Sequence, residues 1–338
     1  MVLAGCGSSS DSNGGGGTPL PDPATLRVRD AENVNDMSAD GRLAGAARGR
    51  AAYWARYDQV PVALRTLPGH QTTEAWCVDE DGRTVGYATD PEGDLVAFYW
   101  ADSGAVPTLL PVPNGYAFNA EDPQALKLVH GGGIIGSLQN VQSGEAVLAY
   151  WSKPDARPVL TATADGRPEE PISVSDNGLL VARTELDEPR NLWQLDATSR
   201  KFRRLDLART SGTPLALPNA VSHKGRIAGT IGAFPTAVRP AWFANTNAAG
   251  TTLPALAGYR VFPEAITDTG LLGGYGLRGE DLVAVTWRNG QITNLNSRLP
   301  RGSEYQLDAV VDITDNGQAL VFGTAPDGEP VWLIVRVP

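Results

Sequence analysis

Short apolar runs separated by turn segments repeat along almost the whole chain. The runs are about five to seven residues long, with a turn signal every 8–12 residues, so they predict strands and are too short for helices. The segment Gly41–Arg56 is rich in Ala and Arg and would favour a helix by propensity alone. Its place in the repeat predicts strands there as well.

Seven glycine-ended turns mark the repeat, at intervals of 41 to 50 residues. They are MSADG (to Gly41), VDEDG (Gly82), LVHGG (Gly132), VSDNG (Gly178), VSHKG (Gly225), ITDTG (Gly270) and ITDNG (Gly317). Asp-Gly and Asn-Gly pairs adopt the positive φ that tight hairpins need. A tryptophan follows each turn: Trp54, Trp100, Trp151, Trp193, Trp242, Trp287 and Trp332. A large aromatic residue at one repeat position is expected to pack between the repeats.

Each repeat therefore predicts four strands, and seven repeats span residues 27–338. Units of about 40–50 residues with four strands are typical of propeller blades. The sequence predicts an all-β protein with one domain, a seven-bladed β-propeller of four-stranded antiparallel blades. The last repeat supplies only three strands, at 308–314, 318–323 and 331–337. The segment Thr25–Asp30 resembles the missing fourth strand and is predicted to close the last blade.

The first 26 residues lie outside this repeat. Residues 7–26 are a tether rich in Gly, Ser and Pro, which cannot bury enough apolar area to fold. Residues 3–6, Leu-Ala-Gly-Cys, resemble the signal-peptide box of bacterial lipoproteins. The resemblance implies that residues 1–6 end a signal peptide whose basic and apolar part lies upstream, and that Cys6 is lipidated. It also implies an extracytoplasmic protein, and Gly7 after the cysteine favours the outer membrane of a Gram-negative bacterium.

The repeats themselves resemble a known family. The segments AITDTGLLGGYG (265–276), VAVTW (283–287) and VAFYW (96–100) resemble the bacterial HAF repeat, which has an Ala-Ile-Asn turn and a His-Ala-Phe signature before a tryptophan. The signature histidine is absent from every repeat here, and only the repeat at 96–100 has the Ala-Phe pair. The resemblance implies an extracellular repeat protein and assigns no catalytic residue.

Composition excludes several classes of function. The net charge is −10, from 28 basic and 38 acidic residues, and no basic run offers a site for nucleic acid. Two Cys and three His leave no disulfide scaffold and no multi-histidine metal site, and no nucleotide-binding motif is present. We therefore expect no metal and no cofactor. No run of 18 apolar residues occurs, so a lipid anchor is the only membrane contact expected.

The remaining cysteine and the histidines predict little chemistry. Cys77 is expected to be a small buried residue on an inner strand. The histidines His70, His130 and His223 lie in different repeats, which argues against a nucleophilic triad.

Carboxylates recur at the turns: Asp40, Asp81, Asp176, Asp268 and Asp315. Their spacing matches neither a sialidase-type box nor a calcium loop, so they are predicted to cap their own hairpins.

Residues that break the repeat are the candidates for a binding site. Arginines in or beside the loops between second and third strands, and tyrosines entering first strands, should lie on one face of the ring. They are Arg48, Arg50, Arg183, Arg239 and Arg278, with Tyr116, Tyr259 and Tyr305. Together they predict a site for an anionic or carbohydrate-like ligand. The alternative is that they are solvated loop residues and rim packing.

The sequence thus favours a monomeric, lipid-anchored binding module without catalysis, whose partner is such a ligand or a protein of the cell envelope. One alternative is a propeller-type glycan lyase or hydrolase that uses carboxylates in the loops as acid and base. Its candidates are Glu121, Asp122, Glu185, Asp187 and Glu188. Another is a purely structural surface protein.

Overall fold

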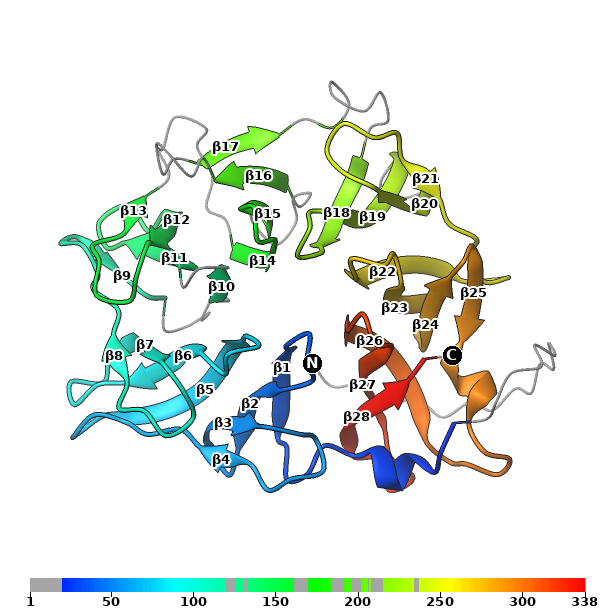
Figure 1. The fold of residues 1–338 in the computed structure, drawn as a ribbon, viewed down its shortest axis with the longest axis horizontal. Helices are drawn as coiled ribbons and strands as arrows, with labels where there is room; N and C mark the ends of the chain where they lie inside the picture. Colours follow the sequence, from blue (N-terminus) through cyan, green and yellow to red (C-terminus); the bar gives the residue numbers. More distant parts are fainter. Residues whose placement is uncertain are drawn as a thin grey trace.

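The structure, a computed structural model, is a seven-bladed β-propeller, as predicted (Figure 1). It describes residues 20–119, 126–129, 133–160, 170–183, 191–195, 202–205, 207, 215–233 and 237–337. Within this part of the chain, six blades are antiparallel sheets of at least four strands, and the last blade has three. Gly41–Arg56, despite its helical propensity, forms two strands of the first blade.

The strands follow the order of the sequence from the axis outwards. Blade 1 contains β1 Asn33–Met37, β2 Leu43–Ala47, β3 Arg50–Trp54 and β4 Val62–Ala63. Blade 2 contains β5 Gln71–Val78, β6 Thr84–Thr89, β7 Leu95–Trp100 and β8 Thr108–Leu109. Blade 3 contains β9 Tyr116–Ala117, β10 Lys127–Val129, β11 Gly133–Asn140, β12 Ala146–Trp151 and β13 Val159–Leu160. Blade 4 contains β14 Glu170–Val174, β15 Leu179–Arg183, β16 Asn191–Leu195 and β17 Phe202–Leu205.

The other three blades complete the ring. Blade 5 contains β18 Leu215–Val221, β19 Ile227–Ala233, β20 Ala237–Phe243 and β21 Thr251–Thr252. Blade 6 contains β22 Arg260–Ile266, β23 Leu272–Arg278, β24 Asp281–Arg288 and β25 Gln291–Asn294, followed by the 3-10 helix η3 Leu295–Arg298. Blade 7 contains β26 Gln306–Ile313, β27 Gln318–Thr324 and β28 Pro330–Arg336.

Antiparallel pairing separates the turns into two faces. The turns between first and second strands lie at one end of the axis, which we call the inner-turn face. The turns between second and third strands lie at the other end, the opposite face. This division decides which residues of the repeat can meet.

The tryptophan position is more specific than the sequence suggested. Five of the tryptophans pair with the residue two positions after the turn glycine: Trp54, Trp100, Trp151, Trp193 and Trp287. Phe243 has that place in blade 5 and Val335 has it in blade 7. Trp242 and Trp332 are therefore out of phase, which corrects the predicted set of seven. The structural position takes an apolar residue, which is aromatic in six of the seven blades.

The N-terminal segment completes blade 7 through a short contact rather than a full strand. The 3-10 helix η1, Pro23–Leu26, precedes a single antiparallel bridge between Arg27 and Leu333. The Val28 N–H donates to the Trp332 carbonyl (2.8 Å), as Leu64, Leu110 and Leu253 donate to the third strands of their blades. The Trp54 Nε1–H donates to the carbonyl of Arg29, just as Trp100 donates to Arg65. The segment thus takes the outer place in blade 7 and joins it to blade 1.

Packing also begins before residue 27, where the propeller was expected to start. Leu20 and Leu26 are buried in the core cluster of blade 7. The Leu20 N–H donates to the carbonyl of Arg298 (2.7 Å), next to η3. The outer segment therefore extends along blade 7 from blade 6 to blade 1.

A β-bulge near the end of the first strand recurs in six blades. The bulge breaks the pairing register just before the turn. A bulge of this kind leaves one residue unpaired and bends the strand. In the second strand, a glycine of the short apolar run lies opposite the bulge. A Cβ at Gly45, Gly86 or Gly274 would come within 2.2 Å of a carbonyl oxygen of the first strand. These glycines are therefore required by a close backbone approach.

Candidate functional site

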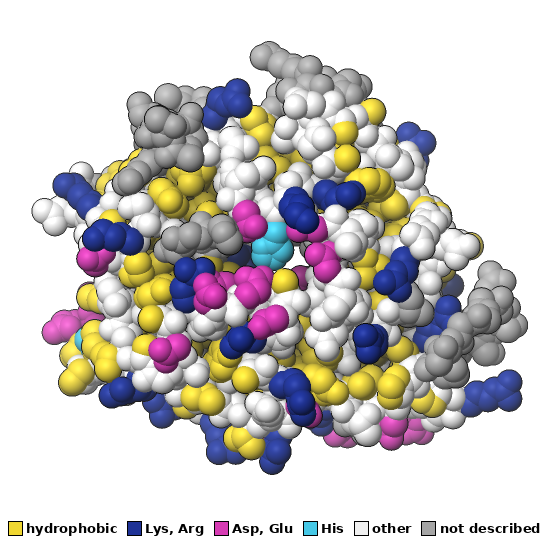
Figure 2. Space-filling view, in the orientation of Figure 1, with side chains coloured by type: hydrophobic (Ala, Val, Ile, Leu, Met, Phe, Trp, Pro, Cys, Tyr) yellow, Lys and Arg dark blue, Asp and Glu magenta, His cyan; other side chains and the backbone are white. Residues whose placement is uncertain are grey.

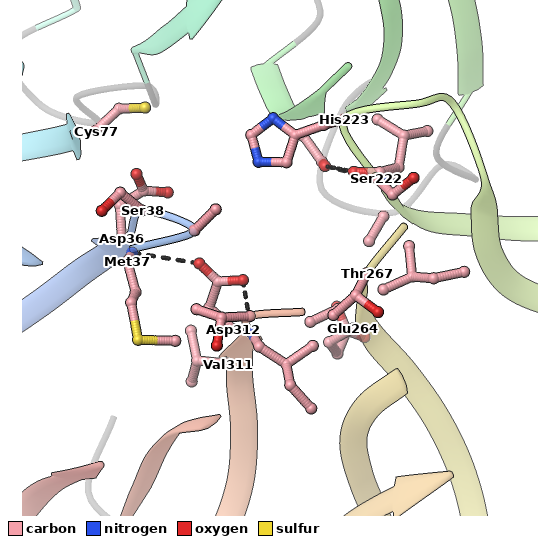
Figure 3. Close-up of a pocket in the computed structure, with 18 of the residues that line it drawn as sticks. Asp36, Met37, Ser38, Cys77, Ser222, His223, Glu264, Thr267, Val311 and Asp312 are labelled. Carbon is pink, nitrogen blue, oxygen red and sulfur yellow. Dashed lines mark hydrogen bonds between the residues drawn. The ribbon is translucent and has the colours of Figure 1, made fainter. Parts of the chain in front are cut away.

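A cavity of about 530 Å³ lies on the axis and opens on the inner-turn face. All seven blades contribute to its lining through the ends of their first strands. Figure 3 shows Asp36, Cys77, Glu264 and Asp312 around an open centre, with His223 at its edge. A volume of this size is within the range of ligand-binding pockets, about 300–1,000 Å³.

The deeper level of the cavity is a ring of side chains, one from each blade, at the second position before the turn. We call it the inner ring: Asp36, Cys77, Lys127, Ser173, Ala220, Ala265 and Asp312. The cysteine is buried, as predicted. Burial, followed by the nearby charge of Asp36, raises the pKa of its thiol well above the ordinary value, so the thiol is neutral.

The polar members of the inner ring connect neighbouring blades. Asp36 accepts the backbone N–H of Val78 (3.0 Å), and Asp312 accepts the N–H of Met37 (3.2 Å). Ser173 accepts the N–H of Val221 (3.1 Å) in the same way. In each case the acceptor belongs to one blade and the donor to the next. The bond from Asp312 to Met37 crosses the joint between the last blade and the first.

Charge in the inner ring is concentrated in three residues. The Lys127 Nζ lies 3.2 Å from Asp36 Oδ1, and both side chains are mostly buried. Burial lowers the pKa of Lys127, but the charges of Asp36 and Asp312 outweigh it and hold that pKa above its ordinary value. Burial, together with the charge of Asp36, raises the pKa of Asp312 to about 7. The inner ring therefore has one stable ion pair and one carboxyl that titrates near neutral pH.

The turns at the mouth are held by a repeated cap. In six blades the first turn residue accepts the backbone N–H of the residue four positions later through its side-chain oxygen, at 2.9–3.2 Å. These residues are Ser38, Asp79, Ser175, Ser222, Thr267 and Thr314. Ser, Thr and Asp make such local bonds because their side chains are short.

The second residue of each turn forms what we call the turn ring, and it connects the blades at the mouth. Its described members are Ala39, Glu80, Asp176, His223, Asp268 and Asp315. Asp268 accepts the N–H of Lys224 (2.8 Å) in the preceding blade, and Asp315 accepts the N–H of Thr269 (3.0 Å).

The prediction that all turn carboxylates cap their own hairpins was therefore wrong for Asp268 and Asp315, and Asp176 likewise contacts the next blade, with its Oδ1 3.2 Å from His223 Nδ1. It holds for Asp40, which bonds to Ser38 and Arg42 within its own turn. Asp81, likewise, forms an ion pair inside its own turn, with Arg83.

His223 lies at the centre of this mouth. Its Nδ1 is 3.2 Å from Asp176 of blade 4, and its Nε2 is 3.7 Å from Glu80 of blade 2. Burial lowers the pKa of His223, but Asp176, Glu80 and Asp268 outweigh it, so the pKa lies above its ordinary value. Figure 2 shows a histidine side chain in the middle of this face with acidic side chains around it.

The arginines and tyrosines proposed from the sequence do not meet at this cavity. None of those with a described side chain lines it. Arg48 and Arg278, at turns of the opposite face, pair with Asp30 (3.3 Å) and Asp281 (3.4 Å). Arg50 and Arg239 are exposed at the start of β3 and within β20.

The three tyrosines serve packing. Tyr116, Tyr259 and Tyr305 are partly buried against the cores of blades 3, 6 and 7. Among the candidates whose side chains the structure describes, Tyr259 and Arg278 come together, with the guanidinium 4.7 Å from the ring centroid. Both belong to blade 6, so the pair is a local contact and does not bring different blades to one site.

Some of the sequence candidates lie outside the described residues. These are Cys6 and the acidic candidates Glu121, Asp122, Glu185, Asp187 and Glu188, together with His130 and the side chain of Arg183. In the part of the chain that the structure describes, no group of three His, Cys, Asp or Glu residues is arranged to hold a metal ion. Among the same residues, no helix is long and apolar enough to cross a membrane.

Sequence reasoning missed Asp36, Lys127, His223 and Asp312 as site residues. A signal was available, because charged residues stand at one repeat position inside apolar strands, as Asp312 does in VVDIT. Position in the repeat, rather than departure from it, identifies the residues that meet on the axis.

Comparison with known proteins supports the fold. No protein-family model matches the chain, and no curated protein matches it. Among solved structures, the propeller domain of the Trilobed protease from Pyrococcus furiosus is similar, with a TM-score of 0.55, 8% identity, and coverage of 88% of this chain and 94% of that chain. A structure of YCF48 bound to D1 peptide has a TM-score of 0.52, 13% identity, and coverage of 94% and 99%.

Virginiamycin B lyase from Staphylococcus aureus is also similar, with a TM-score of 0.52, 8% identity, and coverage of 93% and 98%. The similar structures thus include an enzyme and a peptide complex. At these identities the likeness shows the propeller fold and leaves the function to the site.

Proposed function

We propose that this protein is an extracytoplasmic binding module that takes a segment of a partner protein at the axial cavity. The observation that carries the proposal is the cavity itself, which all seven blades line and which opens on the inner-turn face. A peptide side chain can enter a cavity of this size while the flanking peptide lies across the turn ring. The similar structure of YCF48 bound to D1 peptide supports a peptide as the ligand.

The two aspartates of the inner ring, Asp36 and Asp312, give no separate support to a glycan hydrolase. The Oδ2 atom of Asp312 accepts the N–H of Met37, and its Oδ1 atom accepts the N–H of Ile313 (2.7 Å). Asp36 is bonded to Val78 and Lys127. These carboxyls are engaged in holding blades together.

Membrane attachment is the second part of the proposal. The box at residues 3–6 and the Gly/Ser tether support a lipid on Cys6, with the propeller displayed beyond the tether. The test is to express the chain behind a lipoprotein signal peptide and fractionate the cells. We expect the protein in the membrane fraction and the Cys6→Ser variant in the soluble fraction. Identical fractionation of the two proteins would contradict the anchor.

The binding function is tested by selecting a random peptide library on the purified protein, with two variants for comparison. His223→Trp places a large side chain at the mouth of the cavity, and Glu92→Trp places the same side chain on an exposed turn of the opposite face. Enriched peptides should bind the parent and Glu92→Trp alike and bind His223→Trp at least about tenfold more weakly. The proposal would be overturned if no peptide is enriched, or if the selected peptides bind His223→Trp with the same affinity as the parent.

A further inference from the structure

The mouth of the axial cavity already holds a basic side chain from the chain itself. His223 belongs to blade 5, yet its imidazole reaches Glu80 of blade 2 and Asp176 of blade 4. Blades 2 and 5 are not neighbours in the ring, so the side chain spans the opening. The imidazole is half exposed and is held there by the carboxylates around it.

Those carboxylates are fixed before any ligand arrives. Glu80 accepts the N–H of Ala39 (3.3 Å), while Asp268 and Asp315 accept backbone N–H groups of the turns before theirs. Backbone donors of neighbouring blades thus set the positions of Glu80, Asp268 and Asp315. A site preorganised in this way loses little free energy to ordering when it binds a ligand.

The lining of the cavity is rich in acidic residues. Seven acidic residues line it, against one lysine and one histidine: Asp36, Asp79, Glu80, Glu264, Asp268, Asp312 and Asp315, with Lys127 and His223. Some of them form ion pairs within the protein, Asp36 with Lys127, Asp79 with Arg83 and Asp268 with Lys224 (3.8 Å). The excess of acidic over basic residues favours a negative potential in a concave site, which attracts cations.

We propose that the ligand presents a guanidinium or ammonium group to the turn ring, in the place that the His223 imidazole holds. The lysine or arginine side chain of a bound peptide is such a group. Its donors replace those of the imidazole at Glu80 and Asp176, and its alkyl part lies in the cavity above the inner ring. Charge-assisted hydrogen bonds of this kind are among the stronger ones available to a protein.

His223 then acts as a competitor that depends on pH. The charged groups that face it are Glu80, Asp176 and Asp268, each on a different blade, and all three favour the imidazolium. At low pH the imidazolium occupies the site. At high pH the neutral ring is held less strongly by the carboxylates, so a ligand cation displaces it more easily. Cation binding is therefore stronger at pH 8 than at pH 5.5, and the ionisation of Asp312 over the same range acts in the same direction.

This inference rests on the proposed function, and its test uses a probe of known structure. Butylguanidinium is titrated into the full chain at pH 5.5 and pH 8, while the imidazole proton signals are followed by NMR. With three histidines in the sequence, His→Gln variants assign the signals. We expect binding that is several-fold tighter at pH 8, and a lowered pKa for His223 when the probe is bound, because probe and proton compete. In His223→Gln the dependence on pH should shrink.

Charge variants supply the controls. Glu80→Gln together with Asp176→Asn should weaken probe binding about tenfold or more, since charge-assisted bonds are lost. Glu92→Gln, on the opposite face, should leave the affinity unchanged. Butyrate that binds as well as butylguanidinium, or probe binding that is the same with and without the Glu80 and Asp176 substitutions, would overturn the inference. Selected peptides that need the open mouth but lack Lys and Arg would overturn it while leaving the proposed function intact.

Discussion

The two faces of the propeller use the same kind of hairpin turn in different ways. On the inner-turn face, turn residues bond across the blade boundaries, as Asp315 does to Thr269 and Asp268 to Lys224. On the opposite face, turns such as those at Asp90 and Arg278 bond within their own blade: Asp90 caps its own turn, and Arg278 pairs with Asp281. The cavity that all seven blades line opens on the inner-turn face.

The difference shows where function can arise in a ring of repeats. A residue at a fixed repeat position near the axis meets its counterparts from the other blades. An unusual residue in an outer loop meets only its own blade, as Arg278 and Tyr259 do. A site shared by seven blades must therefore come from repeat positions near the axis.

The largest expected effect is on stability at the inner ring. Asp36→Ala removes the partner of Lys127 and an acceptor for Val78. Breaking a buried ion pair by removing one member costs about 3–5 kcal/mol of unfolding free energy. Asp281→Ala removes the partner of Arg278 on the opposite face and should cost less than about 1 kcal/mol. Urea denaturation of both variants gives the comparison, and equal losses would contradict it.

A double variant separates charge burial from loss of packing. Asp36→Leu with Lys127→Met removes both members of the ion pair together, so that neither charge is left without its partner. It should be more stable than Asp36→Ala alone, because the uncompensated ammonium is gone. A double variant that is no more stable would show that the ion pair does not explain the loss.

The next effect is a dependence on pH that originates in Asp312. Its pKa in the folded protein, about 7, is above its ordinary value of 3.8, so the folded state binds the proton more tightly. The stability that it contributes is present at low pH and is lost as the pH rises from about 4 to about 7. Between pH 5 and pH 8 the parent should therefore lose about 2–3 kcal/mol more than Asp312→Asn. Urea denaturation at the two pH values measures the difference, and parallel curves for parent and variant would refute it.

The turn ring should show a smaller effect, which compares the two faces within one blade. Asp315→Ala removes the acceptor for the Thr269 N–H and should cost about 1 kcal/mol. Glu329→Ala changes an exposed carboxylate at the other end of blade 7 and should cost less than about 0.5 kcal/mol. Thermal unfolding of the two variants measures the difference in stability. A larger loss of stability in Glu329→Ala than in Asp315→Ala would contradict the prediction.

The smallest effect is expected for the arginine that the sequence favoured. Arg278→Ala removes the contact with the Tyr259 ring and the exposed pair with Asp281. The cost should be about 0.5–1 kcal/mol in unfolding free energy, with no change in peptide binding. Weaker peptide binding by Arg278→Ala would place a function on the opposite face.

The fold could be predicted from the sequence because each repeat contains the same pattern of turns and strands. The glycines after the turns and the short apolar runs recur seven times, and an aromatic residue recurs at one position in six blades, so the strands of the last blade were predicted to within two residues. Closure by the N-terminal segment was predicted too, but its form was not. Val28 and Arg29 make the contacts of a fourth strand with only one bridge, and no repeated pattern encodes that.

The site could not be predicted in the same way. Ring geometry brings Asp36 next to Lys127, 91 residues away in the sequence, and His223 next to Glu80 of a distant blade. The β-bulge that frees backbone N–H groups for these side chains has no clear residue signature. The turn carboxylates differ in the sequence by a single position: Asp40 stands directly before its turn glycine and bonds within its own turn, whereas Asp315 stands two residues before its glycine and bonds to a neighbouring blade. Without the ring geometry, that one-residue difference does not indicate which carboxylates reach another blade.

The account depends most on one claim, that the inner-turn face is the binding face. A crystal structure of the protein with a selected peptide tests it directly. We predict that the peptide lies across the turn ring, with one side chain in the axial cavity and with His223 moved away from Glu80. A peptide bound on the opposite face, beside Arg48 or Arg278, or along the outer strands, would contradict the claim.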